Sequence, residues 1–390
     1  MQSKFSYGAN SIPPAPTFLA LASDPKIISF AGGVPDPVTF PISQISQATE
    51  RLLGTKEKAI QAFQYAPSHG YEPLRSWIAE TMRLEDINVE KSQILITSGA
   101  QQALDILGRL FINPGDRIAV TTPTFFAALD TFSVYRPEFL EIPITRGHID
   151  LDIANEVLSK KPKFLYLIPD HQNPCGLSIS QEQRKSLLQM SKKYGVVVIE
   201  DAAYSNLAFN GIAEKPIAAR DDSLTLGNVV YVNTFSKTIA PGLRVGWIAA
   251  NDEIVEKLRA VKLATDVHTS AFNQMIVLEI ATTKLSENII TSRELYSKKC
   301  DRMIDALSDC MPDECWWSEP AGGLFLWLEL PGHIDTKQLF ERAIKESSIA
   351  FVPGSLSAVG KDCDNAIRLS FATVDEARID EGISRLSSLL

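Results

Sequence analysis

Lys237 is the residue whose surroundings in the sequence indicate the most specific chemistry. It follows the apolar run Val229–Val232, within the segment Asn233-Thr234-Phe235-Ser236-Lys237-Thr238. A lysine just past a buried strand is desolvated, which lowers its pKa and frees the amine to form an imine. The hydroxyls of Thr234 and Ser236 and the cationic fork of Arg244 together suit a phosphate. Taken alone, the segment also fits a surface turn with an ordinary lysine.

A second apolar run ends in acidic residues. Val196–Ile199 is followed by Glu200 and Asp201, and Tyr204 lies three residues beyond Asp201. An acid at a strand end, beside the ring nitrogen of a bound heterocycle, keeps that nitrogen protonated and makes the ring an electron sink. Tyr204 would donate to a phenolate oxygen of such a ring. The same residues also fit an acidic helix N-cap.

Two more segments place polar groups after apolar runs. Asn173 precedes a proline, which disfavours helical backbone and lets the asparagine amide point into a cleft. Ser98–Gln102 joins a strand to a helix, where backbone N–H groups make a natural phosphate cradle. Each segment alone also fits an ordinary turn or loop.

The elements that must position these residues are buried strands alternating with helices. Near-continuous apolar runs are typical of strands covered on both faces. We expect strands at Ile94–Thr97, Arg117–Val120, Phe164–Ile168, Val196–Ile199, Val229–Val232 and Val245–Ala249. This alternation predicts an α/β fold with a mostly parallel sheet and helices on both faces. Ligands bind beyond the carboxyl ends of such strands, so the four polar segments should meet in one site.

The pattern changes from about Ile289 onward. A long amphipathic helix, a strand at Gly323–Leu330 and further helix predict a smaller α+β domain. We therefore expect an N-terminal arm and small-domain segment at 1–40, a large domain at 41–288 and a small domain at 289–390. The proline-rich Ile12–Pro16 cannot begin as a helix and is predicted to be an extended arm.

Composition excludes several classes of protein. The net charge of -9 over 390 residues argues against a nucleic-acid partner. No apolar run approaches the roughly 20 residues that span a bilayer, and the polar N-terminus lacks a signal peptide, so we expect a cytoplasmic protein. The five cysteines contain no C-x-x-C pair and the five histidines are scattered, which predicts reduced thiols and no metal site.

The polar segments described above, in their order along the chain, resemble those of the class I/II aminotransferases of pyridoxal-5′-phosphate (PLP) fold type I. The greatest resemblance is to the branch with α-aminoadipate and kynurenine aminotransferases, and it covers nearly the whole chain. Matching motifs are Ser29–Pro37, Gly70–Arg75, Thr97–Gln102, Pro123–Phe125, Asn173–Pro174, Asp201–Tyr204, Ser236–Lys237, Gly242–Gly246, His268–Ser270 and Arg368–Phe371. The resemblance implies a large domain with a mostly parallel seven-stranded sheet, PLP as cofactor and a homodimer with shared sites.

The resemblance also implies roles for individual residues. Lys237 resembles the lysine that binds PLP covalently and shuttles the proton, and Asp201 resembles the partner of the pyridine nitrogen. The other expected cofactor contacts are Asn173 and Tyr204 at the phenolate oxygen, Phe125 on the ring, and Ala100, Gln101, Thr234, Ser236 and Arg244 at the phosphate. Tyr65 occupies the place of a tyrosine that reaches the neighbouring subunit's phosphate. On the substrate side, Arg368 resembles the arginine that grips the α-carboxylate, and we expect Asn173, Gly33 and His69 nearby.

Departures from the family pattern cluster on the substrate side. Ala100 stands where a serine is usual, His69 where many relatives carry an acid, His171 where an aromatic is frequent and Cys175 where a threonine is usual. The N-terminal arm lacks the arginine with which many relatives recognise a distal carboxylate.

These observations leave alternative functions open. The leading hypothesis is an aminotransferase that moves the α-amino group of an amino acid to a 2-oxo acid such as 2-oxoglutarate. The alternative is β- or γ-elimination or cyclisation of an unusual amino acid, such as a hydroxylated arginine, with the histidines as extra acid–base groups. The third hypothesis is a non-enzymatic sensor domain. It is disfavoured because no DNA-binding segment precedes the fold and the net charge is negative.

Overall fold

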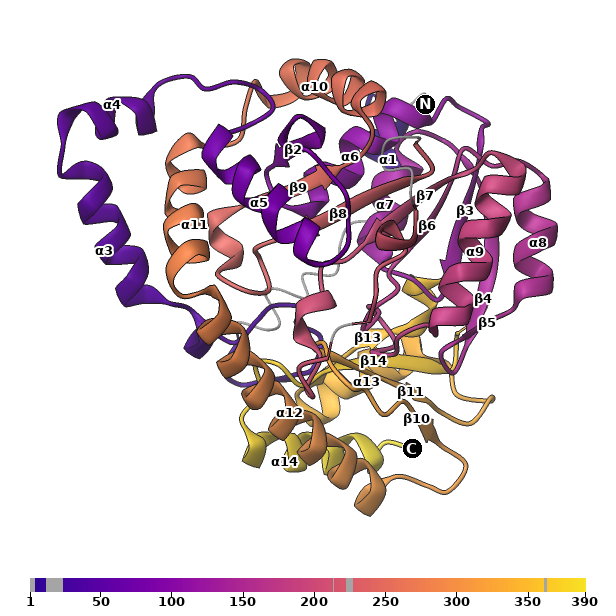
Figure 1. The fold of residues 1–390 in the computed structure, drawn as a ribbon. Coiled ribbons are helices and arrows are strands. Elements are labelled where there is room, and N and C mark those ends of the chain that lie inside the picture. Colours follow the sequence, from indigo (N-terminus) through magenta and orange to yellow (C-terminus); the bar gives the residue numbers. More distant parts are fainter. Residues whose placement is uncertain (1–3, 12–23, 213, 222–226, 361–362) are drawn as a thin grey trace.

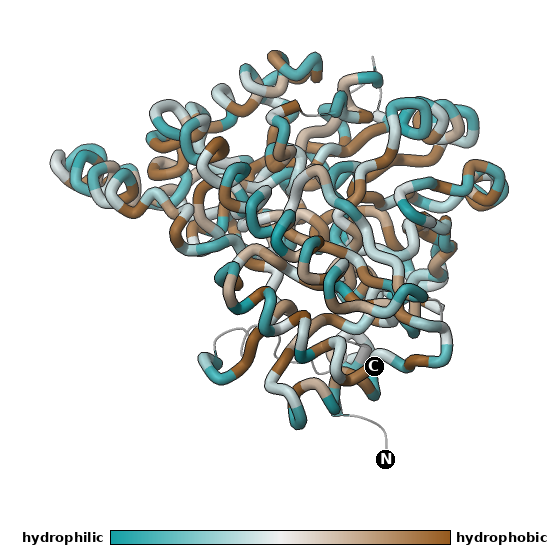
Figure 2. The backbone as a smooth tube through the Cα atoms, turned by 90° about the horizontal axis from the view of Figure 1, so that it is seen from below, coloured by the Kyte–Doolittle hydropathy of each residue, from teal (hydrophilic) through white to brown (hydrophobic). Residues whose placement is uncertain are grey.

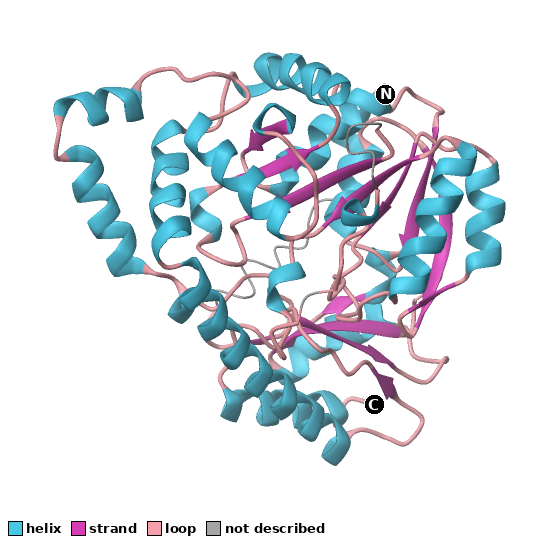
Figure 3. Ribbon diagram, in the orientation of Figure 1, coloured by secondary structure: helices cyan, strands magenta, loops and turns pink. Residues whose placement is uncertain are grey.

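The larger part of the molecule is built on one sheet (Figures 1 and 3). The structure is a computed structural model that describes residues 4–11, 24–212, 214–221, 227–360 and 363–390. The strand order is β2-β9-β8-β7-β6-β3-β4-β5. The strands are β2 (Ile94–Thr97), β3 (Arg117–Thr122), β4 (Glu138–Thr145), β5 (His148–Ile149), β6 (Phe164–Leu167), β7 (Val197–Asp201), β8 (Val229–Thr234) and β9 (Gly246–Ala249). Strands β8, β7, β6, β3 and β4 are parallel, while β9 is antiparallel to both its neighbours. The predicted mostly parallel sheet is therefore confirmed, with the two-residue β5 as an eighth strand at one edge.

Both faces of this sheet are covered, because successive strand residues enter different cores. Ile94 and Ile96 belong to one hydrophobic cluster, and Leu95 between them belongs to the other. Helices α6 (Ala100–Phe111), α7 (Phe126–Ser133) and α10 (Asp252–Asp266) contribute to the cluster of Leu95. Helices α5 (Glu72–Leu84), α8 (Leu151–Ser159), α9 (Gln181–Tyr194) and α11 (Ala271–Thr283) contribute to the cluster of Ile94. The continuous apolar runs are explained by this double burial.

A second sheet lies in the lower part of Figure 1, next to the C-terminal helices. Its order is β10-β11-β14-β13, with β10 (Trp316–Trp317), β11 (Phe325–Glu329), β13 (Val352–Pro353) and β14 (Ala366–Ser370). Helices α12 (Leu285–Cys310), α13 (Thr336–Ser347) and α14 (Glu376–Ser387) accompany it. Strand β1 (Ile28–Ser29) pairs in parallel with β12 (Ile349–Ala350), which ties an N-terminal segment to this part of the chain. The predicted boundaries at 40 and 288 remain predictions.

Helices α3 (Ile42–Leu53) and α4 (Lys56–Phe63) form an arm that extends away from the main body. The arm is at the left of Figure 1 and projects to the left in Figure 2 as well, where brown hydrophobic positions alternate with teal ones. Its apolar side chains are not all covered: Ile42, Ile60 and Phe63 are 64%, 56% and 69% exposed. These three side chains therefore leave apolar surface of the arm exposed.

Strand β4 is absent from the predicted set, because Glu138 and Glu141 interrupt its apolar residues. The predicted extended arm at Ile12–Pro16 lies outside the described residues, while the short helix α1 (Tyr7–Ser11) precedes it. Within the described ranges, no helix combines the length and apolar character needed to cross a membrane, and no three His, Cys, Asp or Glu side chains are grouped as metal ligands.

Candidate active site

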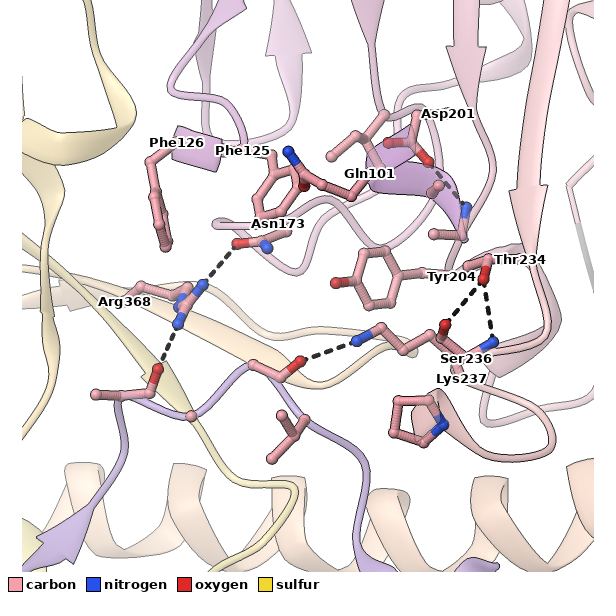
Figure 4. A pocket seen from close by; sticks show the side chains of 18 of the residues that line it. Gln101, Phe125, Phe126, Asn173, Asp201, Tyr204, Thr234, Ser236, Lys237 and Arg368 are labelled. Atoms are coloured by element: carbon pink, nitrogen blue, oxygen red, sulfur yellow. Dashed lines mark hydrogen bonds between the residues drawn. The ribbon is translucent and has the colours of Figure 1, made fainter. Parts of the chain in front are cut away.

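A cavity of about 270 Å³ lies beyond the carboxyl ends of the central strands, between the N-terminus of α6 and the Ala31–Val34 segment (Figure 4). Most of the predicted site residues line it. Those brought together are Gly33, Ala100, Gln101, Phe125, Asn173, Asp201, Tyr204, Thr234, Ser236, Lys237, Arg244 and Arg368. Lining residues that the sequence does not single out are Ala31, Gly32, Val34, Phe126, Ile168, Ala203 and Pro241. Phe126 directly follows Phe125, and this adjacency was the available signal for it.

Lys237 points across the cavity to the Ala31–Val34 segment (Figure 4). Its Nζ donates a hydrogen bond to the Gly33 carbonyl oxygen at 2.8 Å. Burial, with the cations of Arg368 and Arg244 nearby, lowers the pKa of Lys237 to about 8. The amine therefore has a substantial neutral fraction near physiological pH, as a nucleophile that forms imines requires.

Asp201 ends strand β7 with its carboxylate buried at the cavity wall. The hydroxyl of Tyr166 donates to Oδ2 at 2.9 Å, and the backbone N–H of Ala203 donates to Oδ1 at 3.3 Å. Burial raises the pKa of Asp201 to about 6, against the opposing effect of the Tyr166 hydrogen bond. A cationic group placed next to this buried carboxylate would stabilise its charged form.

The turn between β2 and α6 meets Arg244 at another end of the cavity. Arg244 donates from Nη2 to the Ser98 carbonyl oxygen at 3.0 Å. Gly99 has a φ of +82°, and a Cβ built on it would lie 2.4 Å from that same Nη2, so only glycine lets the guanidinium approach the turn. The hydroxyls of Thr234 and Ser236 lie 2.9 Å apart. Together with the first backbone N–H groups of α6, these donors form a site for a phosphate.

Arg368 of strand β14 brings a third cation to the cavity. It donates to the Asn173 side-chain oxygen at 3.0 Å and to the Ala31 carbonyl oxygen at 2.6 Å. Its Nε is buried without a hydrogen-bond partner. Burial lowers the pKa of Arg368 to about 10, so the side chain remains a cation at neutral pH. A buried cation with an unmet donor suits a carboxylate ligand.

A family model described as "Aminotransferase class I and II" matches residues 26–386. The chain belongs to the class I and II aminotransferases. It is 41% identical to aromatic-amino-acid aminotransferase 1 of Thermococcus litoralis, over 95% of this chain and 90% of that protein. It is 39% identical to 2-aminoadipate transaminase of Thermus thermophilus, over 95% of this chain and 92% of that protein.

Solved structures agree with this assignment. The structure of Pyrococcus horikoshii kynurenine aminotransferase in complex with PMP has a TM-score of 0.93 and 37% identity, covering 99% of this chain and 96% of that one. The structure of the α-aminoadipate aminotransferase LysN from Thermus thermophilus, complexed with N-(5′-phosphopyridoxyl)-L-leucine, has a TM-score of 0.91 and 38% identity, covering 99% of this chain and 97% of that one.

The cofactor of this aminotransferase is PLP, and the cavity fits it at three places. The Gly99 turn with Arg244 offers room and donors for a phosphate. Asp201 offers a buried carboxylate for a protonated ring nitrogen. Lys237 offers a partly neutral amine for an aldehyde.

Two of the predicted site residues do not line this cavity. Tyr65 is 80% exposed and lies beside His268, with ring centroids 5.8 Å apart. His69 lies outside the cavity, its Nδ1 is buried without a partner, and burial lowers its pKa. The expectation that His69 contacts the substrate stays a prediction.

His171, the second histidine that departs from the family pattern, is also away from the cavity lining. It is buried, and it leaves so little room that a Cβ on Gly322 would lie 2.4 Å from its Cε1. In the part of the chain that the structure describes, no histidine lines the cavity. His69 and His171, the extra acid–base groups of the elimination or cyclisation hypothesis, are thus not among these lining residues.

Proposed function

We propose that this aminotransferase takes amino acids with apolar or aromatic side chains and passes the amino group to a 2-oxo acid such as 2-oxoglutarate. The observation that carries this proposal is the cavity wall next to Arg368. The ring of Phe126 lies 5.8 Å from the Arg368 guanidinium carbon, and Phe125, Val34 and Ile168 also line the cavity. Such a wall gains free energy by burying an apolar side chain.

The charges of the site support the same substrate class. Among the described residues that line the cavity, the cations are Lys237, Arg244 and Arg368. They are assigned to the cofactor aldehyde, the cofactor phosphate and the substrate α-carboxylate, so no further cation of this lining would favour a distal carboxylate over an apolar side chain. The sequence of residues 1–50 contains Lys4 and Lys26 as its only basic residues. The similarity to proteins named for aromatic amino acids and kynurenine agrees with this preference.

Different side chains of this chain would perform the separate parts of the reaction. Bound PLP supplies an electron sink for the charge that develops at the substrate Cα. Arg368 holds the substrate α-carboxylate and thereby orients the Cα–H bond toward Lys237. The Lys237 amine would take the Cα proton of the bound substrate and carry it toward the cofactor. Asp201 would keep a proton on the ring nitrogen, and Asn173 and Tyr204 would hold the ring's phenolate oxygen.

We also propose that the enzyme is a cytoplasmic homodimer in which the α3–α4 arm covers a second copy. The exposed apolar residues of the arm need a partner surface. Tyr65 follows the arm directly and is too exposed to serve its own cavity. In a dimer its hydroxyl would reach the phosphate of the other subunit.

A screen of products by mass spectrometry tests the function. The PLP-loaded protein is incubated with phenylalanine, leucine, 2-aminoadipate or glutamine, each with and without 2-oxoglutarate. We expect glutamate together with the 2-oxo acid of phenylalanine or leucine, formed faster than from 2-aminoadipate. Equal or faster turnover of 2-aminoadipate would overturn the substrate class. A product that has lost water or a γ-substituent without an acceptor would overturn transamination itself.

A further inference from the structure

Helix α10 carries a fully buried lysine outside the active-site cavity. Lys262 is 0% exposed and does not line the cavity. Its Nζ donates to both carboxylate oxygens of Asp266, at 2.9 and 3.0 Å, and to the Gln102 side-chain oxygen at 2.8 Å. A buried lysine is costly unless its charge is paired and its donors are used, and here three acceptors satisfy it.

The partners of Lys262 hold the turn that leads into α6. The Gln102 side-chain oxygen accepts from the Ser98 backbone N–H at 2.7 Å, while its amide donates to Asp266 at 2.6 Å. The Ser98 hydroxyl donates to Asp266 at 3.3 Å. These bonds join Ser98 and Gln102 to each other and to α10, and neither Ser98, Gln102 nor the two α10 residues line the cavity. Ala100 and Gln101 of the same turn do line it, together with Arg244, which bonds to the Ser98 carbonyl oxygen.

The position of Asp266 at the end of α10 is energetically unfavourable, and its bonds within this cluster offset that cost. It is the last residue of α10, where the helix dipole disfavours a negative charge. The next residue, Val267, has a φ of +66°, which is strained for a β-branched side chain. The His268 N–H bonds back to the Asp266 carbonyl oxygen at 2.7 Å, closing a γ-turn of the rare strained form. The local chain is thus held in a costly shape that keeps Asp266 against the Ser98 turn.

We propose that Lys262 and Asp266 are a positioning pair that sets the affinity of the Ser98–Gln102 turn for the cofactor phosphate. The inference rests on the PLP site proposed above. Asp266 orders the turn through Ser98 and Gln102, but its negative charge would repel a phosphate bound on the other side. Lys262 neutralises that charge and adds a bond to Gln102. Removing Lys262 therefore leaves an uncompensated anion beneath an anion-binding turn.

The test compares PLP with pyridoxal, which lacks the phosphate. Both form an imine with Lys237, so binding to cofactor-free protein is followed by absorbance. For Lys262→Met we expect the Kd of PLP to rise about tenfold or more, and the Kd of pyridoxal to change less than about twofold. The double variant K262M/D266N should recover part of the PLP affinity, because the unpaired charge is gone.

Lys299→Met is the matched control, because Lys299 is also buried and paired with an aspartate, Asp36, at 2.6 Å, but its hydrogen-bond partners, Asp36 and the Ala372 carbonyl oxygen, do not belong to the Ser98–Gln102 turn. It should leave the ratio of the two Kd values unchanged. If K262M fails to fold, Gln102→Ala cuts the link between Lys262 and Ser98 and should shift the same ratio. An unchanged ratio in K262M or Q102A, or equal weakening of both ligands, would overturn the positioning role. Failure of the wild-type protein to bind PLP would instead overturn the proposed function.

Discussion

At the scale of single residues, Lys237 combines a position at a strand end with a partly neutral amine. Burial is the main cause of its lowered pKa of about 8. The rate at which cofactor-free protein forms an imine with pyridoxal should therefore rise with pH up to about 8 and level off above it, because only the neutral amine attacks. Stopped-flow absorbance measures this profile.

Lys237→Ala is the control for that measurement. It should abolish the imine and the covalent adduct that borohydride reduction leaves on the protein. A reduced adduct found on another lysine by peptide mass spectrometry would contradict the assignment of Lys237.

Asp201 gives a second prediction at this scale, which concerns stability. Its pKa is raised by burial to about 6, so the folded state binds the proton more tightly than the unfolded state. Stability is then lost as pH rises from about 4 to 6, and the loss is complete above that range. At pH 7 cofactor-free Asp201→Asn should be more stable than wild type, by at most about 3 kcal/mol.

Urea unfolding of both cofactor-free proteins between pH 4 and 8 measures this difference. Tyr166 and Ala203 donate to different oxygens of the carboxylate. The asparagine oxygen can accept from the Ala203 N–H, and its amide can donate to the Tyr166 hydroxyl oxygen, so both contacts can persist. A difference that does not grow with pH would show that the charge of Asp201 is not its cause. The same substitution should weaken PLP binding, because the ring nitrogen loses its anionic partner.

At the scale of elements, the turn from β2 to α6 depends on a glycine. Gly99 has a positive φ, and Arg244 occupies the space that a side chain would need. Gly99→Ala should displace the guanidinium and raise the Kd of PLP about tenfold or more, while the fold remains. A titration of cofactor-free protein with PLP measures the change.

Gly195→Ala separates backbone strain from loss of the phosphate contact. Gly195 ends α9 with a φ of +68°, and a Cβ there would meet nothing within 4 Å. Its substitution should cost about 1 kcal/mol of stability and leave PLP affinity unchanged. Equal effects of the two substitutions on PLP affinity would contradict the role given to Gly99.

At the scale of the whole molecule, the α3–α4 arm is explained by a second copy of the chain. Ile60 is 56% exposed on α4, so an aspartate there is tolerated in the monomer but would be buried as an unpaired charge in a dimer. Ile60→Asp should weaken dimerisation by about tenfold or more. Light scattering coupled to size-exclusion chromatography measures the mass.

Ile153→Asp serves as the comparison, because α8 lies at the opposite side of the molecule from the arm in Figure 1 and Ile153 is 36% exposed. It should remain dimeric at concentrations where the Ile60 variant dissociates. A wild-type protein that is monomeric at all concentrations would overturn the proposed assembly.

The sequence by itself determined the elements and much of the candidate chemistry. Buried strands appear as apolar runs because both sheet faces are covered, and the polar segments that follow them contain Lys237, Asp201 and Asn173. These are local patterns, so they can be read without knowing which segments become neighbours. Strand β4 was missed because its burial is incomplete and Glu138 and Glu141 interrupt its apolar residues.

Only the tertiary structure decided which distant groups meet. The partner of Arg368 is Asn173, 195 residues away, and that of Lys237 is the Gly33 carbonyl, 204 residues away. Tyr166 reaches Asp201 from a neighbouring strand, and Lys262 supports the Ser98 turn from another helix. His69 and His171 are excluded from the cavity lining although the sequence places them beside site motifs. Contacts of this kind depend on how the elements pack, and this packing cannot be inferred from the spacing of residues along the chain.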